Sequence, residues 1–481
     1  MEFNVLKGRV SDIDAFAHII FCNKDGVCLG DHSNLQELLQ PFVDGGEFGT
    51  KFGGNLYAIA PASLSVKRLL FFNLGDKPTN DSYRKASASA LKLLREKNVT
   101  HVSLSLSGLD PSARRAVVEG VVLGDYQFNN LRSETDQLPK SLEHFSVHVG
   151  PASEPEVVRW FKIAQGTLRA RDLCQYPANI MDPTAMAQQA QRWGEQFGFK
   201  TEVLNKPQLE ELNMGALLSV AQGSQRPPHL IVMDYQPASP SGKTFVFVGK
   251  AVTFDSGGLS LKPANAMAEM KGDMGGGAAV IGLMTVLRDS SCNHRVVGLV
   301  PAVENMPSGS ATRPSDVVTS MSGITVEINN TDAEGRLILA DALTYAARYQ
   351  PDYVVDFATL TGACLVALGP KVFGVMGNDQ KLVDEILTAG QEVDEIFWQL
   401  PLVDDYNEML KSQVADIANV AGSRWGGTIT AGLFLQKFAK DYKWAHCDIA
   451  ATIFEKPDAY RPAGGTGTGV RMAMAMLDRM T

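Results

Sequence analysis

Apolar segments of strand length alternate with helix-like segments through the second half of this chain. We expect strands at residues 230–235, 244–248, 296–303 and 353–357, and helices at 276–288 and 337–349. Such alternation requires crossover connections between neighbouring strands, and it therefore predicts a mainly parallel sheet with helices on its faces.

The first 150 residues predict a separate α/β unit. Strands are expected at 17–22, 69–74, 100–106 and 145–149, and helices at 83–97 and 114–123. Because 481 residues exceed one ordinary domain, we divide the chain into an N-terminal α/β domain (1–150), a connecting helix (151–174) and a larger C-terminal domain (175–481). The fold class is α/β, and the larger domain is expected to have a central, mostly parallel mixed sheet flanked by helices.

Composition excludes several classes of protein. Hydrophobic residues make up 45% of the chain and charged residues 20%, as in an ordinary soluble globular protein. The net charge is −9 and no run of Lys or Arg stands out, which argues against nucleic-acid binding. The N-terminus shows no apolar signal region and no stretch is long enough to span a membrane, so we expect a cytoplasmic protein. The six cysteines are scattered, and we expect reduced core residues.

Seven charged residues stand at predicted strand ends or in glycine-rich turns, where burial of charge requires compensation: Lys250, Asp255, Lys262, Asp273, Asp332, Glu334 and Arg336. The last three alternate along one extended segment, so their side chains can face one pocket. Four carboxylates in one pocket would repel one another, and two divalent cations would remove that repulsion. Carboxylate-rich sites suit Mn, Mg or Zn, and the chain has no HExxH or CxxC sequence.

The role of Lys250 has two interpretations. As a metal ligand its amine must be neutral, which burial beside divalent cations would favour by lowering its pKa. Alternatively, Lys250 forms an ion pair with Asp255. Taken singly, a lysine is usually a solvated surface group and an aspartate before two glycines is usually a turn residue, so only the combination indicates a site.

Residues 248–263, 270–276 and 330–337 are similar to the signatures of the leucyl (cytosol) aminopeptidase family, and the last is the most specific of the three. Residues 304–309, 358–363 and 171–179 support the resemblance. It extends over roughly residues 170–481, whereas residues 1–150 match only in length and α/β character. By resemblance, residues 175–481 form the catalytic domain of a dimetal metallo-exopeptidase.

The resemblance implies two metal ions per subunit, Mn²⁺ or Zn²⁺, with Mg²⁺ and Co²⁺ as further candidates. Asp255, Asp332 and Glu334 would hold one ion, together with the Asp332 carbonyl, and Lys250, Asp255, Asp273 and Glu334 would hold the other. A metal-bridged water would act as nucleophile, as two-metal chemistry allows. Lys262 would polarise the scissile carbonyl. Arg336 would hold a bicarbonate ion that shuttles protons, or would instead be a structural ion-pair partner.

The substrates implied by the resemblance are peptides with a free N-terminus, and Leu, Met and other apolar residues are preferred. The residues expected to bind substrate are Met270, Asn330, Thr359, Leu360, Gly362 and Ala451, with Phe454 at a position where the family often has Met. Each of these could equally be a plain core residue. The family forms hexamers, so we expect a homohexamer. Ala251 and Ser315 stand where we expect Gly, and Gln175 stands where we expect Asn.

Other functions fit less well. A dinucleotide-binding oxidoreductase could use Gly275 to Gly277, but the GxGxxG spacing is incomplete. A serine hydrolase lacks its GxSxG turn. A non-enzymatic DNA-binding or scaffold protein that kept the fold is the stronger alternative. Metal-dependent hydrolysis of Leu-p-nitroanilide would separate the enzyme from that alternative.

Overall fold

The computed structural model describes residues 1–6, 15–30, 32, 35–134, 138, 140–149, 154–238, 242–453 and 457–480. The chain forms two compact units, which we describe separately. The smaller contains residues 1–165 and 457–462, and the larger contains residues 166–456 and 463–481. The division falls within helix α4 (Glu154–Gln175). Phe454 lies outside the described residues, so its predicted place in a substrate pocket is not described.

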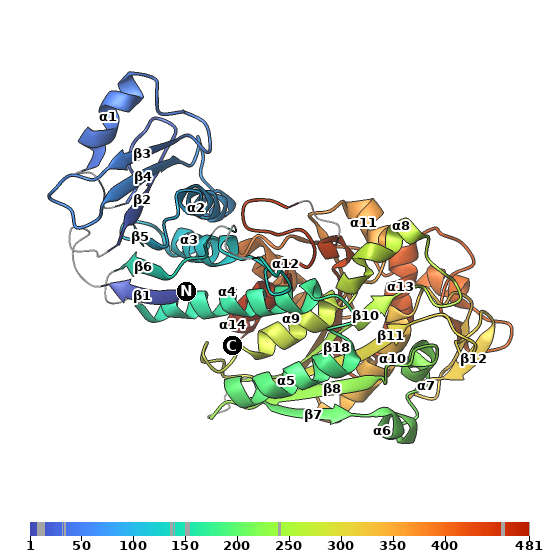
Figure 1. Ribbon diagram of the computed structural model, residues 1–481. Coiled ribbons are helices and arrows are strands. Elements are labelled where there is room, and N and C mark those ends of the chain that lie inside the picture. Colours follow the sequence, from blue (N-terminus) through green and yellow to red (C-terminus); the bar gives the residue numbers. More distant parts are fainter. Residues whose placement is uncertain are drawn as a thin grey trace. The chain divides into compact units, whose positions relative to one another are not determined.

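The smaller unit is built on a six-stranded sheet of order β1-β6-β5-β2-β4-β3 (Figure 1). All neighbours in this sheet are parallel except β3, which pairs antiparallel with β4. Its elements are β1 (Glu2–Leu6), β2 (Ala17–Cys22), α1 (Gln36–Asp44), β3 (Asn55–Ile59), β4 (Arg68–Asn73), α2 (Asn80–Arg95), β5 (His101–Ser105), α3 (Pro111–Gly124) and β6 (His144–His148).

Helices α2 and α3 of this unit pack closely. A side chain added at Gly120 of α3 would lie 2.3 Å from the Arg84 carbonyl of α2, so only glycine allows this approach. Arg84 and Glu119 are both fully buried and form an ion pair at 2.9 Å, and Arg115 also contacts Glu119. Two arginines therefore compensate the buried carboxylate between the helices.

The larger unit contains a nine-stranded mixed sheet of order β16-β15-β18-β14-β9-β11-β8-β7, with β10 paired to β11. Parallel pairs form its centre, and β7, β8 and β15 add antiparallel pairs. Its strands are β7 (Lys200–Leu204), β8 (His229–Tyr235), β9 (Thr244–Gly249), β10 (Ala251–Asp255), β11 (Arg295–Asn305), β14 (Tyr353–Ala358), β15 (Phe373–Gly377), β16 (Phe397–Gln399) and β18 (Lys443–Asp448).

Helices accompany this sheet as the alternating pattern predicts (Figure 1). They are α5 (Pro183–Phe197), α6 (Lys206–Glu211), α7 (Gly215–Ala221), α8 (Ala264–Met267), α9 (Gly275–Met284), α10 (Gly335–Ala346), α11 (Gly362–Leu368), α12 (Gln380–Glu392), α13 (Gly427–Gln436) and α14 (Val470–Arg479), with 3₁₀ turns η4 (Ala268–Gly272), η5 (Ala347–Tyr349), η6 (Asp404–Leu410) and η7 (Ala450–Ile453). Strand β14 and helix α9 are almost wholly buried, which explains their continuous apolar sequences.

A small sheet of β12 (Asp316–Thr319), β13 (Thr325–Ile328) and β17 (Ile417–Ala418) completes the larger unit. Just before β12, Ser315 has φ +77°, a left-handed conformation that glycine adopts without strain. Ser315, which stands where the family resemblance leads us to expect Gly, therefore occupies a position where the backbone favours glycine.

The expected fold class is confirmed, and the differences are local. The predicted helix at 276–288 is shorter, because α9 ends at Met284 and turns follow. The helix predicted at 337–349 ends in a 3₁₀ turn from Ala347. All six cysteines are buried free thiols. In the part of the chain that the structure describes, no helix has the length and apolar character needed to cross a bilayer.

Candidate metal centre

The candidate site lies where several central strands of the larger unit end. Lys250 connects β9 to β10, and Asp255 is the last residue of β10. The Lys250 amide donates to the Phe357 carbonyl of β14, which ties this corner to the neighbouring strand. Ligands in open α/β sheets gather at such carboxyl ends. The site therefore occupies the position that the strand pattern favours.

Two glycines, one in the first turn of α9 and one at the end of β9, allow close packing. A side chain added at Gly276 would lie 1.9 Å from the Phe357 carbonyl carried by β14. One added at Gly249 would meet the Gly276 carbonyl at 2.5 Å. These contacts bring the start of α9, and with it Asp273, against the ends of β9 and β14. The glycines thus explain the helix position without a bound dinucleotide.

Three buried carboxylates converge at this corner. Oxygens of Asp255, Asp273 and Glu334 all lie within 4.8 Å of one another. Between them, Lys250 Nζ lies 2.8 Å from Asp273 Oδ2 and 2.9 Å from Glu334 Oε1. The structure thus pairs Lys250 with Asp273 and Glu334, whereas the ion-pair interpretation of the sequence chose Asp255.

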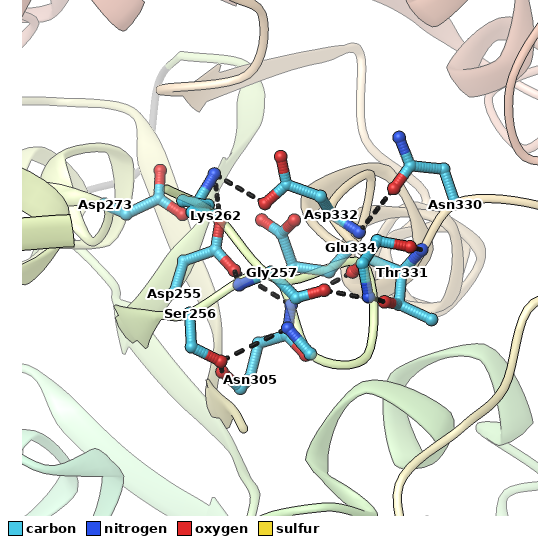
Figure 2. Close-up of polar contacts among 12 residues, drawn as sticks. Asp255, Ser256, Gly257, Lys262, Asp273, Asn305, Asn330, Thr331, Asp332 and Glu334 are labelled. Atoms are coloured by element: carbon cyan, nitrogen blue, oxygen red, sulfur yellow. Dashed lines mark hydrogen bonds and ion pairs between the residues drawn. The ribbon is translucent and has the colours of Figure 1, made fainter. Parts of the chain in front are cut away.

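The fourth carboxylate joins through a second lysine. Lys262 Nζ lies 2.9 Å from Asp255 Oδ2 and 2.6 Å from Asp332 Oδ1, as Figure 2 shows. Asp332 is more open than the other acids, with a side chain 32% exposed. Two ammonium groups therefore compensate four carboxylates, and the cluster keeps an excess of negative charge.

The pKa values follow from burial and these contacts. Burial and the nearby Glu334 raise the pKa of Asp255 to about 6. Burial also raises the pKa of Asp273 well above its usual value. Burial alone would lower the pKa of Lys250, but Asp273, Glu334 and Asp255 outweigh burial and raise it. Without a bound cation, Lys250 is therefore protonated, and it must lose its proton to become a ligand.

The loop that carries Asp332 is fastened to the loop that follows Asp255. The Thr331 hydroxyl donates to the Gly257 carbonyl at 2.6 Å (Figure 2). It also accepts from the Ser260 amide at 2.8 Å. The Thr331 amide donates in return to Ser260 Oγ at 3.1 Å. Asn330 Oδ1 accepts from the Asp332 amide at 2.9 Å. These bonds hold two candidate ligand loops in one arrangement.

A cavity of about 260 Å³ opens over the cluster. It brings together eleven of the predicted site residues: Lys250, Asp255, Lys262, Met270, Asp273, Asp332, Glu334, Arg336, Thr359, Leu360 and Gly362. Ala450 lines this cavity, and its neighbour Ala451 is buried beside it. Asn330 is engaged in the loop contacts described above. Substrate binding by Met270, Asn330, Thr359, Leu360, Gly362 and Ala451 stays a prediction.

Arg336 lies in the first turn of α10 and reaches the same cavity. Its Nη1 donates to the Asn419 carbonyl at 2.9 Å. Its Nε is buried and, among the described residues, has no hydrogen-bond partner. Burial lowers its pKa to about 10. Arg336 is also in no ion pair within the described part of the chain, so the structural ion-pair interpretation finds no partner there.

Several residues that organise the site were not singled out from the sequence. Asn305, at the end of β11, donates from Nδ2 to Asp255 Oδ1 at 2.8 Å. Asn419 Nδ2 donates to the Asn330 carbonyl at 2.7 Å, and Thr361 Oγ1 donates to Asp448 Oδ2 at 2.6 Å. The 304–309 motif could have pointed to Asn305, because that residue comes shortly after the apolar run 296–303.

These residues fit divalent cations. Asp273 Oδ2, Asp332 Oδ1 and Glu334 Oε1 are buried oxygens that accept no hydrogen bond of ordinary geometry from the described residues, and each meets a lysine ammonium as an ion pair. Hard carboxylate oxygens with an excess of negative charge are the donors that Mn²⁺ and Mg²⁺ prefer, and Zn²⁺ also accepts them. The fold and the site together define an α/β protein with a carboxylate cluster suited to divalent cations.

Comparison with known proteins identifies the family. The model of the cytosol aminopeptidase catalytic domain matches residues 168–474, and that of the family's N-terminal domain matches residues 29–135. A probable cytosol aminopeptidase of Syntrophotalea carbinolica is 44% identical over 459 residues, 92% of each chain. One of Chlorobaculum tepidum is 44% identical over 436 residues, 86% of each chain.

Solved structures agree. The bottromycin maturation enzyme BotP in complex with Mn has a TM-score of 0.86 and 35% identity, and the match covers 97% of this chain and 99% of that one. The chain belongs to the cytosol aminopeptidase family. It is a metal-dependent aminopeptidase, and neither the site nor the relatives support the non-enzymatic alternative.

Proposed function

We propose that this enzyme removes N-terminal Leu, Met and other apolar residues from peptides with the help of two divalent cations. The observation that carries the proposal is the convergence of Asp255, Asp273 and Glu334 within 4.8 Å at the bottom of a cavity. Four carboxylates with only two lysines would destabilise an ordinary protein core, because buried negative charge without a compensating cation is costly. A cation site explains it.

The residues that would hold the cations are Lys250, Asp255, Asp273, Asp332 and Glu334, with Asp255 and Glu334 shared between the two positions. The ion in BotP is Mn, and Mn²⁺ or Zn²⁺ is our proposal for this chain. When bound, such ions supply Lewis acidity and a water nucleophile near neutral pH. Lys262 bridges Asp255 and Asp332 and lines the cavity.

Lys262 and Arg336 are the proposed catalytic residues. Both line the cavity and both are cationic, so they can stabilise negative charge that develops on a carbonyl oxygen. Arg336 Nε has no hydrogen-bond partner among the residues that the structure describes, which supports the binding of a small anion such as bicarbonate, since a guanidinium recognises planar oxyanions in a bidentate way. Such an anion would accept the proton that the ligand carboxylates cannot take.

Selectivity for a free N-terminus has a basis in the same cavity. An α-ammonium group can meet the Asp273 carboxylate, whereas a blocked N-terminus cannot. Met270, Leu360, Gly362 and Ala266 give part of the lining an apolar character, which suits an aliphatic first side chain. The absence of a side chain at Gly362 leaves room, because no atom of the described residues lies within 4 Å of an added Cβ there.

Hydrolysis of Leu-p-nitroanilide by the purified protein tests the proposal. Activity should require Mn²⁺ or Zn²⁺, disappear with a chelator and return when metal is restored. N-acetyl-Leu-p-nitroanilide is the matched control and should not react. Metal analysis should give two ions per chain. Metal-independent hydrolysis, or equal turnover of the acetylated substrate, would contradict the proposal.

The assembly and location are also proposals. We infer a homohexamer from the family resemblance and a cytoplasmic location from the names of the relatives. Sedimentation velocity would test the assembly, since a hexamer of 52.0 kDa chains differs sixfold in mass from the monomer.

A further inference from the structure

Asn305 ends strand β11 and lies directly behind the carboxylate cluster. It is 4% exposed, and its carbonyl accepts hydrogen bonds from the Ser256 amide at 3.0 Å and from Ser256 Oγ at 2.7 Å. These backbone bonds fix Asn305 beside the loop that follows Asp255. Its side chain is therefore placed by the sheet itself.

The Asn305 amide group makes two hydrogen bonds through one atom. Nδ2 donates to Asp255 Oδ1 at 2.8 Å and to the Thr331 carbonyl at 3.0 Å (Figure 2). Both partners only accept, so the amide nitrogen, and not its oxygen, must face them. One side chain thus joins the residue proposed to be shared by both cations to the residue before Asp332.

These contacts fix the orientation of the Asp255 carboxylate. Its Oδ1 accepts from Asn305 Nδ2 and from the Gly257 amide at 2.9 Å, while its Oδ2 contacts Lys262. Both donors to Oδ1 are neutral. They fix the carboxylate without cancelling its charge, whereas a lysine or arginine at position 305 would oppose a cation. The negative charge of Asp255 remains available to the cavity.

Space around Asn305 is restricted. A side chain added at Gly258 would lie 2.8 Å from Asn305 Oδ1, and Gly258 has φ +64°. The loop that contains Gly258 therefore packs against the Asn305 amide group, and a longer Gln at position 305 would not fit unless this loop moved. An aspartate would fit, but it would present an acceptor to Asp255 in place of a donor.

We propose that Asn305 is a positioning residue that orients Asp255 and couples the Asp255 and Asp332 loops for cation binding. This inference rests on the proposed function, because it concerns ligands of the same site. Removal of a group that orients a metal ligand costs about 10–100-fold in metal affinity. The loss should fall on cation binding first and on turnover only as a result.

The experiment measures Mn²⁺ binding by isothermal titration of metal-free protein. The variants are Asn305→Ala and the nearly isosteric Asn305→Asp. The matched control is Asn378→Ala. Asn378 Nδ2 likewise makes two hydrogen bonds, in its case to the carbonyls of Ala439 and Tyr442, and neither partner is a proposed ligand. We expect both Asn305 variants to raise the Mn²⁺ Kd at least about tenfold, and Asn378→Ala to leave it unchanged.

A second readout separates positioning from general destabilisation. At saturating Mn²⁺ the Asn305 variants should regain most of kcat with little change in KM for Leu-p-nitroanilide. Should Asn305→Ala melt below the assay temperature, Asn305→Asp carries the test. Wild-type Kd values in the Asn305 variants would overturn the positioning role while leaving the aminopeptidase intact. A wild-type protein that neither binds Mn²⁺ nor hydrolyses the substrate would overturn both.

Discussion

The Thr359 hydroxyl donates a 2.7 Å hydrogen bond to Asp273 Oδ1. Lys250 Nζ approaches the same oxygen at 2.8 Å and also donates to the Thr359 carbonyl at 2.9 Å. Thr359 was predicted as a wall of the substrate pocket, and it does line the cavity. Its hydroxyl nevertheless forms a hydrogen bond with Asp273, a candidate metal ligand. The pocket and the metal centre therefore share this residue.

Replacing Thr359 by Val should weaken cation binding, because the hydroxyl bond to Asp273 is lost while the shape is kept. Removal of such a partner lowers metal affinity by about 10–100-fold. Thr359→Ser keeps the hydroxyl and should bind close to normally. Mn²⁺ titration calorimetry checks both variants. Equal affinities for the Val and Ser variants would contradict a role of the hydroxyl.

Lys262→Ala should keep the bound metal and lose rate. Removing one group that stabilises a developing oxyanion costs about 10²–10³-fold in kcat. Asp332→Ala should instead lose metal, since it deletes a proposed ligand. Plasma mass spectrometry of the desalted proteins, combined with kcat at saturating substrate, separates the two effects. Metal loss in Lys262→Ala with full occupancy in Asp332→Ala would exchange their roles.

The His446–Asp356 pair should make stability depend on pH. Both side chains are fully buried in ion-pair contact, and Trp444 Nε1 also donates to Asp356. Burial lowers the pKa of His446, but Asp356 outweighs burial and raises it above 6.5. Because the folded pKa exceeds the unfolded one, the stabilisation is fully present below pH 6.5. It is lost as the pH rises through the folded pKa.

His446→Gln is the variant that tests this dependence. Breaking a buried ion pair costs about 3–5 kcal/mol, so the thermal midpoint should fall most at acidic pH. The difference from wild type should narrow toward alkaline pH in scanning calorimetry from pH 5 to 9. A difference that stays constant with pH would contradict the assignment.

Ser315→Gly should stabilise the larger unit. A residue other than Gly at φ +77° carries strain of about 1 kcal/mol or more, which glycine would relieve. The Ser315 amide bond to the Ile328 carbonyl would remain. The midpoint of thermal unfolding should rise, with Ser322→Gly on the neighbouring turn as control. A lower midpoint for Ser315→Gly would mean that the serine side chain contributes more than the strain costs.

The class of fold follows from the pattern of apolar residues along the chain. Apolar runs of strand length separated by helical segments can be buried only against one another, and this gave the mixed sheet and its accompanying helices. The same pattern singled out the acids and lysines that line one cavity in the structure, because those residues stand at strand ends and in glycine-rich turns, where the backbone allows a close approach. The ends of the helices were predicted less accurately, as at α9, because they depend on local turns.

Which groups meet in the site depends on how the elements pack in three dimensions. The carboxylates of Asp255 and Glu334 are 79 residues apart, and the partnership of Lys250 with Asp273 and Glu334 depends on how β9, η4 and α10 pack. The same holds for Asn305, whose amide meets Asp255 through the pairing of β10 with β11. Hydrogen bonds of this kind depend on distance and direction in space, and residue order does not encode either of them.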